Sequence, residues 1–540
     1  MTTIGDVSWQ VLRAHGIDTV FGNPGSNELP FLAAMPEGTR YVLGLHEGAV
    51  LGMADGYAQV TGGPALVNLH AASGSGNAMG ALTNAVYSHT PLVLTAGQQV
   101  RSTVGQEVML TNVDAASLTR PLVKWAAEPL DPQDVPRALS QAVHTALLPP
   151  RGPVYLSVPY DDWAAEAAPA ASHLPGRRTT PAAALDTGAL DELAGLLAGA
   201  RNPVLVLGPQ VDADRANSDA VRLAESLGCP VWIAPSASRC PFPTRHPAFR
   251  GVLPASVRAV TERLDGHDVV LVAGAPVFRY HQFLPGDLLP EGARLLHLTA
   301  DPDEAARAPV GEAWVAPVGP ALAALAGRVP ASGRPPLPPR PPFPRPASAT
   351  GHVPPEELFA LVREAAPDDA VHVVESTSTA EAYWAQADLA APGGYLFPAS
   401  GALGFGLPAA VGAQLAHGSA RRVVALVGDG SANYGITALW TAAQYRVPVV
   451  FVILKNGTYG ALRGFAGLLG TGETPGLDVP GLDFVKIAEG YGVPAVSVRD
   501  AAATAAALKE AFDADGPRLL EVVTGPGVDG DHRLAAFRNG

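Results

Sequence analysis

Residues 421–458 read RRVVALVGDGSANYGITALWTAAQYRVPVVFVILKNGT and decide the fold class of this chain. Two apolar runs, at 421–430 and 447–454, enclose a stretch of helical length. Both runs are continuous rather than alternating, which is typical of strands buried on both faces of a parallel sheet. The segment therefore predicts a strand–helix–strand unit with parallel strands.

The same pattern recurs along the chain. Further apolar runs lie at 65–70, 91–97, 153–159, 203–209, 268–276, 370–377 and 518–523. Between them lie stretches rich in Ala and Leu that are long enough for helices, such as 191–200 and 500–514. Strand and helix in alternation predict an α/β protein built from doubly wound parallel sheets.

Two segments divide the 540 residues. The sequence PPLPPRPPFPRP at 335–346 has eight prolines in twelve residues, which favours an extended, semi-rigid linker. A weaker break lies at 167–184. We therefore expect three domains, at 1–180, 181–340 and 341–540, each with its own sheet.

The composition excludes some classes of partner. The net charge of −14 argues against binding to nucleic acid or to an anionic membrane, since both favour a basic surface. The start of the chain lacks the pattern of a signal peptide, and the longest apolar stretch, at 401–416, is interrupted by Gly and Pro. We expect a cytoplasmic protein whose two cysteines, Cys229 and Cys240, are unpaired.

Polar residues follow two of the predicted strands. Asp429 stands between Gly428 and Gly430 and is followed by Ser431, and Asn456 ends the next strand 27 residues later. Each sequence alone is an ordinary turn. Because parallel strands end at one edge of a sheet, the two together predict a shared site for Mg²⁺ or Ca²⁺ and a diphosphate.

The spacing of this pair resembles the diphosphate-and-metal motif of thiamine diphosphate enzymes. The family usually has Asn where this chain has Lys455. The resemblance implies that Asp429, Asn456 and the Thr458 carbonyl hold the metal, with Tyr459 beside the cofactor. It also implies a pyrimidine-binding first domain, a central domain and a diphosphate-binding third domain.

A second segment resembles the same family. HEGAV…ADGYA, from residue 46, is similar to the segment whose glutamate activates the cofactor, which implies that role for Glu47. Without the resemblance, Glu47 would be read as an acidic residue at a helix N-terminus. The resemblance places Gly401 and Leu403 against the aminopyrimidine ring. In this family the two motifs meet across a subunit interface, so a homo-oligomer, and specifically a homotetramer, is expected.

The remaining motifs narrow the resemblance to the decarboxylase branch. Ser26 lies in FGNPGSNELPFL, His70 ends ALVNLH, and His281 lies in VFRYHQF. The resemblance implies that Ser26 holds the substrate carboxylate, His70 transfers protons and His281 assists aldehyde release. A turn or helix-cap serine and packing histidines remain the alternatives.

An apolar pocket is also implied, and it suits an aromatic 2-oxo acid such as benzoylformate. Its lining residues by resemblance are Glu28, Met109, Leu110, Thr377, Phe397, Ala461 and Phe465. Gly464 departs from the family, which has a bulky aromatic residue there. The expected enzyme is a carboxy-lyase, with a thiamine-dependent carboligase resembling acetohydroxyacid synthase, or a nucleotide-binding protein without thiamine, as the alternatives.

Overall fold

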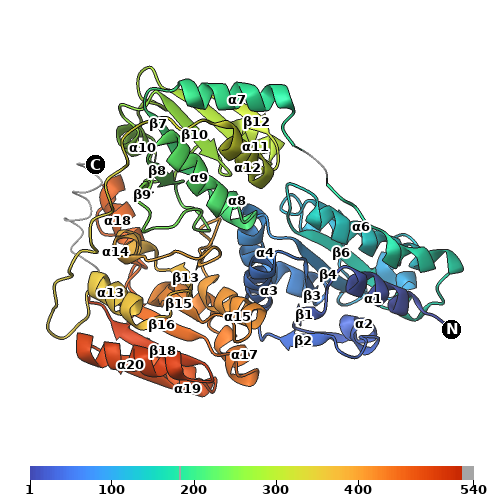
Figure 1. The fold of residues 1–540 in the computed structure, drawn as a ribbon. Coiled ribbons are helices and arrows are strands. Elements are labelled where there is room, and N and C mark those ends of the chain that lie inside the picture. The colour runs from blue at the N-terminus through green and yellow to red at the C-terminus, as the bar shows by residue number, and fades with distance from the viewer. Residues whose placement is uncertain (182–183, 282, 526–540) are drawn as a thin grey trace.

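The computed structural model describes residues 1–181, 184–281 and 283–525, and it contains three six-stranded sheets, one in each third of the chain (Figure 1). Every strand pairing within the sheets is parallel, and helices cover the sheets. The predicted α/β fold class is therefore confirmed.

The strands are described here in their spatial order. The first sheet runs β2 (Arg40–Leu43), β1 (Thr19–Gly22), β3 (Ala65–Leu69), β4 (Leu92–Gln98), β6 (Val154–Pro159) and β5 (Trp125–Ala127). The second runs β12 (Glu312–Val315), β11 (Arg294–Thr299), β10 (Val269–Ala273), β7 (Pro203–Leu207), β8 (Val231–Ile233) and β9 (Phe249–Val252). The third runs β14 (Tyr395–Leu396), β13 (Val371–Glu375), β15 (Val423–Gly428), β16 (Val450–Lys455), β18 (Arg518–Val523) and β17 (Ala495–Val498).

The α-helices of the described chain connect these strands. Those of the first domain are α1 (Ile4–Ala14), α2 (Leu29–Ala33), α3 (Glu47–Thr61), α4 (Ala71–Tyr87), α5 (Ala115–Leu118) and α6 (Val135–Leu147). The central domain has α7 (Thr187–Gly199), α8 (Pro209–Ala213), α9 (Asn217–Leu227), α10 (Val257–Arg263), α11 (Pro302–Arg307) and α12 (Val318–Arg328). The third has α13 (Pro355–Ala365), α14 (Ala380–Gln386), α15 (Gly406–His417), α16 (Asp429–Ala432), α17 (Ala438–Gln444), α18 (Gly460–Leu469), α19 (Phe484–Gly490) and α20 (Ala501–Asp513).

All nine apolar runs singled out in the sequence are strands of these sheets. The other strands are mostly short, and several lie at sheet edges, so their apolar runs are too brief to stand out. The strand β11, RLLHLT, is six residues long, yet a charged residue and a histidine interrupt its apolar run. Burial on both faces explains why the longer strands could be recognised from composition.

Helices α3 and α15 join the first and third domains, and Figure 1 shows them side by side. A Cβ atom on Gly56 would lie 2.2 Å from the carbonyl oxygen of Ala409, and one on Gly412 would lie 1.8 Å from that of Met53. The two glycines therefore allow the backbones of the helices to touch. One hydrophobic core cluster consequently runs from the first sheet through both helices into the third sheet.

The proline-rich segment at 335–346 has neither helix nor strand and follows the protein surface between α12 and α13. Every third residue is partly buried, from Arg334 through Leu337, Arg340 and Phe343. This is the period of a polyproline II helix, which has three residues per turn. The guanidinium groups of Arg340 and Arg363 lie 5.4 and 4.2 Å from the centre of the Phe343 ring, so cation–π contacts fix the segment against the fold.

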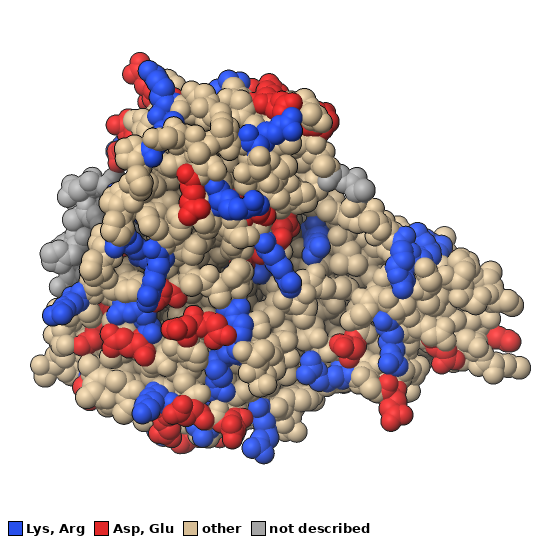
Figure 2. Space-filling model, viewed as in Figure 1, with Lys and Arg blue, Asp and Glu red and all other residues tan. Residues whose placement is uncertain are grey.

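Cys229 and Cys240 are free and buried, and burial raises the pKa of each thiol to about 12. Among the described residues, no helix combines the length and the apolar character needed to cross a membrane. Acidic and basic side chains are interspersed on the face shown in Figure 2, without a large basic patch.

Candidate active site

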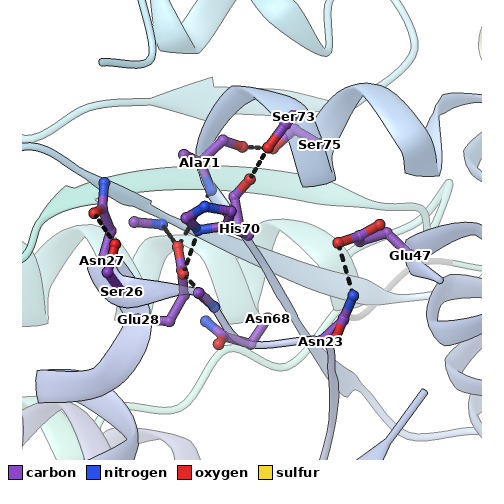
Figure 3. Close-up of polar contacts among 12 residues, drawn as sticks. Asn23, Ser26, Asn27, Glu28, Glu47, Asn68, His70, Ala71, Ser73 and Ser75 are labelled. Atoms are coloured by element: carbon purple, nitrogen blue, oxygen red, sulfur yellow. Dashed lines mark hydrogen bonds and ion pairs between the residues drawn. The ribbon is translucent and has the colours of Figure 1, made fainter. Parts of the chain in front are cut away.

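A hydrogen-bonded histidine–glutamate pair lies at the carboxyl end of the first sheet (Figure 3). His70 directly follows β3, and its Nδ1 lies 2.8 Å from Oε2 of Glu28. The Glu28 side chain is fully buried, whereas that of His70 is 21% exposed. With Nδ1 donating to the carboxylate, the imidazole keeps Nε2 free to exchange a proton with a ligand.

Backbone groups hold the carboxylate of Glu28 in place. It accepts N–H bonds from Gly25 at 3.0 Å, Ala71 at 3.2 Å and Gly97 at 2.8 Å. A Cβ on Gly25 would lie 2.0 Å from Nδ1 of His70, so this position requires glycine. Ala71 has a φ of +43°, an uncommon conformation for alanine. The backbone is thus shaped around the pair, with the Glu28 carboxylate buried and the His70 ring partly exposed.

Glu47 is the first residue of α3 and lies beside this pair (Figure 3). It is buried, and its two carboxylate oxygens accept hydrogen bonds from the amide groups of Asn23 at 3.2 Å and Asn77 at 3.0 Å. These bonds orient a carboxylate that makes no salt bridge with any of the residues that the structure describes. Sequence reasoning missed both asparagines, because an Asn in a turn or a helix carries no distinctive signal.

Three residues of the predicted site are exposed around this centre. Ser26 begins a short 3-10 turn, and its hydroxyl donates to the side chain of Asn27 at 3.1 Å. Met109 and Leu110 lie in the loop after β4 and are 86% and 40% exposed. Such exposure is uncommon for large apolar side chains in a folded protein, and contiguous apolar surface of this kind marks binding sites.

A second group of polar residues lies at the carboxyl end of the third sheet. Asp429 follows β15, and its Oδ2 accepts the N–H groups of Asn456 at 3.0 Å and Gly457 at 2.6 Å. Its Oδ1 accepts the N–H of Gly430, and Oδ1 of Asn456 accepts that of Thr458. The structure therefore brings Asp429 and Asn456 together at adjacent strand ends.

This second group fits a divalent cation. Asp429 is 2% exposed, and burial raises the pKa of its carboxyl, with the surrounding N–H groups opposing the shift. A desolvated carboxylate beside an amide oxygen and the carbonyl oxygen of Thr458 is a set of hard oxygen ligands, which Mg²⁺ and Ca²⁺ prefer. The ring of Tyr459 packs directly against the turn, since a Cβ on Gly430 would lie 2.5 Å from this ring. Gly428 and Ser431 flank Asp429 in the same turn.

Lys455 points away from these oxygens. Its amine lies 3.0 Å from Oε2 of Glu521 on the neighbouring strand β18. The Glu521 carboxylate also accepts the backbone N–H of Phe484 and the hydroxyl of Ser497. The departure from the family motif is thus accommodated by a salt bridge behind the turn.

The other predicted pocket residues come from the central and third domains. His281 is exposed, and its ring meets that of Phe465 on α18 edge to face, with centroids 4.6 Å apart. Ala461 lies on the same helix and is half-buried, while Thr377 is exposed after β13. Phe397 packs in part against the hydrophobic core, which also supports its reading as a core residue. Gly401 is exposed and Leu403 half-buried in the loop before α15.

The two polar groups are separate within one chain. Across the described residues, no hydrogen bond, ion pair or ring contact joins Glu28, Glu47 and His70 to Asp429 and Asn456. Both groups nevertheless lie at carboxyl ends of parallel strands, where ligands bind in open α/β sheets.

Comparisons with known proteins agree with this geometry. Family models for thiamine pyrophosphate enzymes match three segments: the N-terminal TPP binding domain at 2–118, the central domain at 190–325 and the C-terminal TPP binding domain at 376–522. The chain is 61% identical over 527 residues to benzoylformate decarboxylase of Pseudomonas aeruginosa, covering 97% of this chain and 99% of that protein.

Two solved structures are also similar. A thiamine diphosphate-dependent 4-hydroxybenzoylformate decarboxylase of Rhodococcus jostii has a TM-score of 0.96 and 65% identity, over 97% of this chain and 99% of that one. Benzoylformate decarboxylase of Polynucleobacter necessarius has a TM-score of 0.94 and 36% identity, over 98% of this chain and all of the other. This chain therefore belongs to the thiamine diphosphate-dependent decarboxylases.

Proposed function

We propose that this protein catalyses the nonoxidative decarboxylation of an aromatic 2-oxo acid, with benzoylformate giving benzaldehyde and carbon dioxide. The observation that carries the proposal is the His70–Glu28 pair beside Glu47. These residues place a proton-transfer group and a separately oriented carboxylate at one edge of the first sheet. The similarity to two named benzoylformate decarboxylases supports the choice of substrate.

The proposed cofactors are thiamine diphosphate and Mg²⁺, with Ca²⁺ as a substitute. Thiamine diphosphate, when bound, supplies a carbon nucleophile and an electron sink for decarboxylation. Asp429, Asn456 and the Thr458 carbonyl would hold the cation, with Gly428, Gly430, Ser431 and Tyr459 around the diphosphate. Gly401 and Leu403 would support the aminopyrimidine.

The residues of the first domain then act on protons and on the substrate. Glu47, held by Asn23 and Asn77, would hydrogen-bond the aminopyrimidine. His70 would deliver and remove protons through Nε2, since Glu28 occupies Nδ1. Ser26 would bind the substrate carboxylate without placing a charge against it, and His281 would assist aldehyde release.

The proposed pocket suits a phenyl group. Its apolar walls come from Met109, Leu110, Phe397, Ala461 and Phe465, with Thr377 at one side. A Cβ at Gly464 would meet no atom within 4 Å, so the helix α18 leaves space at this position. We infer that substituted phenyl rings are accepted as well as benzoylformate.

We also propose that the active site is completed by a second copy of the chain in a cytoplasmic homotetramer. The separation of the two polar groups within one chain and the exposure of Met109 support this assembly. The proposed boundaries remain 1–180 for the pyrimidine-binding domain, 181–340 for the central domain and 341–540 for the diphosphate-binding domain.

A direct assay tests the proposal. Protein loaded with thiamine diphosphate and Mg²⁺ is given benzoylformate, 4-hydroxybenzoylformate or pyruvate, and aldehyde and carbon dioxide are measured. We expect each of the two aromatic acids to give aldehyde and carbon dioxide in equal amounts. Turnover of pyruvate alone, or conversion of pyruvate to acetolactate, would instead favour the carboligase alternative. Analytical ultracentrifugation measures the assembly.

A further inference from the structure

The loop at 400–406 carries Leu403 and is held by side chains from two domains. On one side, Oδ1 of Asn84, on α4, accepts the backbone N–H and the hydroxyl of Ser400 at 3.0 and 2.6 Å. The amide group of Asn84 donates to the carbonyl oxygen of Ala402 at 3.0 Å. Asn84 is 2% exposed, so these bonds are made in a buried setting.

On the other side, Glu375 binds the backbone that follows Leu403. Its Oε1 accepts the N–H of Gly404 and its Oε2 accepts the N–H of Gly406, both at 2.6 Å. Glu375 ends β13 and is fully buried, and burial raises its pKa to about 7, while the loop N–H groups lower it. The carboxylate accepts hydrogen bonds from the loop backbone, and these bonds favour its ionised form.

Glycines make this approach possible. A Cβ on Gly406 would lie 2.9 Å from Oε2 of Glu375. Gly404 has a φ of +99°, and a Cβ there would lie 2.8 Å from that of Tyr434. The backbone after Leu403 therefore approaches Glu375 and Tyr434 more closely than a residue with a side chain would allow.

We propose that Asn84 and Glu375 are positioning residues that set the height of Leu403 beneath the aminopyrimidine ring of thiamine diphosphate. The inference rests on the proposed function, because it assumes that Leu403 supports that ring. Each residue binds the loop on one side of Leu403, Asn84 through Ser400 and Ala402 and Glu375 through Gly404 and Gly406. Loss of either anchor would leave the diphosphate site around Asp429 intact while weakening the binding of the ring.

The test separates binding of the ring from binding of the diphosphate. The full chain is titrated calorimetrically with thiamine diphosphate and, separately, with inorganic diphosphate, each in the presence of Mg²⁺. The variants are Glu375→Gln and Asn84→Asp, which keep the shape of the side chain. In the first, an amide donor faces a backbone N–H, and in the second, a carboxylate oxygen faces the Ala402 carbonyl. The matched control is Glu357→Gln, another buried glutamate of the third domain, whose carboxylate is bonded to Ser348 instead of this loop.

We expect both variants to bind thiamine diphosphate at least about tenfold more weakly than wild type, with inorganic diphosphate affinity changed less than about twofold. The control should retain both affinities. Unchanged affinity for thiamine diphosphate in both variants, or equal weakening of both ligands, would overturn the inference. Wild-type protein that binds inorganic diphosphate but not thiamine diphosphate would refute the proposed function instead. Asn84 and Glu375 lie in different domains, so misfolding of one variant leaves the other interpretable.

Discussion

The substitution Glu28→Gln tests the organisation of the catalytic centre. Oε2 of Glu28 faces two donors, His70 Nδ1 at 2.8 Å and the Gly25 N–H at 3.0 Å. Oε1 faces two others, the N–H groups of Gly97 at 2.8 Å and Ala71 at 3.2 Å. Turned towards Gly97 and Ala71, the glutamine NH₂ group meets two N–H donors; turned the other way, it meets the Gly25 N–H and forces His70 to change tautomer or lose its Nδ1 bond, so one or two hydrogen bonds are lost.

The magnitude follows from these contacts. A hydrogen bond to a charged group contributes about 1.5–3 kcal/mol, and relaxation of the loop recovers part of the loss. We expect a destabilisation of about 3 kcal/mol. The value of kcat should fall by more than the fraction of folded protein does, because His70 either loses its Nδ1 acceptor or takes the wrong tautomer. A fall of about 100-fold in kcat corresponds to about 2.7 kcal/mol of lost transition-state stabilisation.

The assay measures kcat and KM for benzoylformate together with thermal unfolding of the loaded enzyme. The control is Glu37→Gln, an exposed glutamate of the same domain, which should leave kcat and unfolding unchanged. Glu28→Gln enzyme with a kcat within twofold of wild type would refute the role of the pair. A fall in stability with an unchanged kcat would show that Glu28 is structural alone.

Three further predictions concern other parts of the molecule. Lys455→Asn leaves Glu521 buried without its cation and should lower the free energy of unfolding by about 1–3 kcal/mol. Calorimetry should find an Mg²⁺ affinity within about threefold of wild type. A tenfold change in that affinity would place Lys455 in the metal site. Burial raises the pKa of Asp55 to about 6, so its folded state holds the proton more tightly and stability is lost as pH rises from about 4 through 6. In denaturant unfolding, the free energy of unfolding of Asp55→Asn should therefore rise relative to that of wild type by on the order of 2 kcal/mol between pH 4 and pH 7.5. A difference between the two proteins that does not change with pH would contradict this. Phe465→Ala removes the edge-to-face contact with His281 and should lower kcat/KM for benzoylformate about two- to tenfold, with an unchanged value arguing against a pocket role.

The local pattern of the sequence was sufficient for the fold class and for one half of the candidate site. Long strands buried on both faces have continuous apolar runs, so nine strands could be placed before the structure was known. Asp429 and Asn456 follow consecutive strands, and parallel pairing alone brings such residues to one edge. These features depend on short spacings along the chain, where chain geometry leaves few alternatives.

Glu28 shows where that reasoning ended. The resemblance gave it as a polar residue of the pocket, but its partner His70, 42 residues away in sequence, and its complete burial emerged only from the structure. Asn23, Asn77, Asn84 and Glu375 were not recognised either, because their partners lie on another helix or in a distant loop.

The sequence by itself therefore determined where most of the longer strands lie and which residue types end them. The tertiary structure decided which of those polar groups face one another, which are desolvated, and that Lys455 pairs with Glu521 away from Asp429 and Asn456. The physical reason is that burial and hydrogen bonding depend on contacts between distant segments. In this protein, Gly56 and Gly412 let two helices from different domains meet, and the packing that results cannot be read from the spacing of residues along one segment.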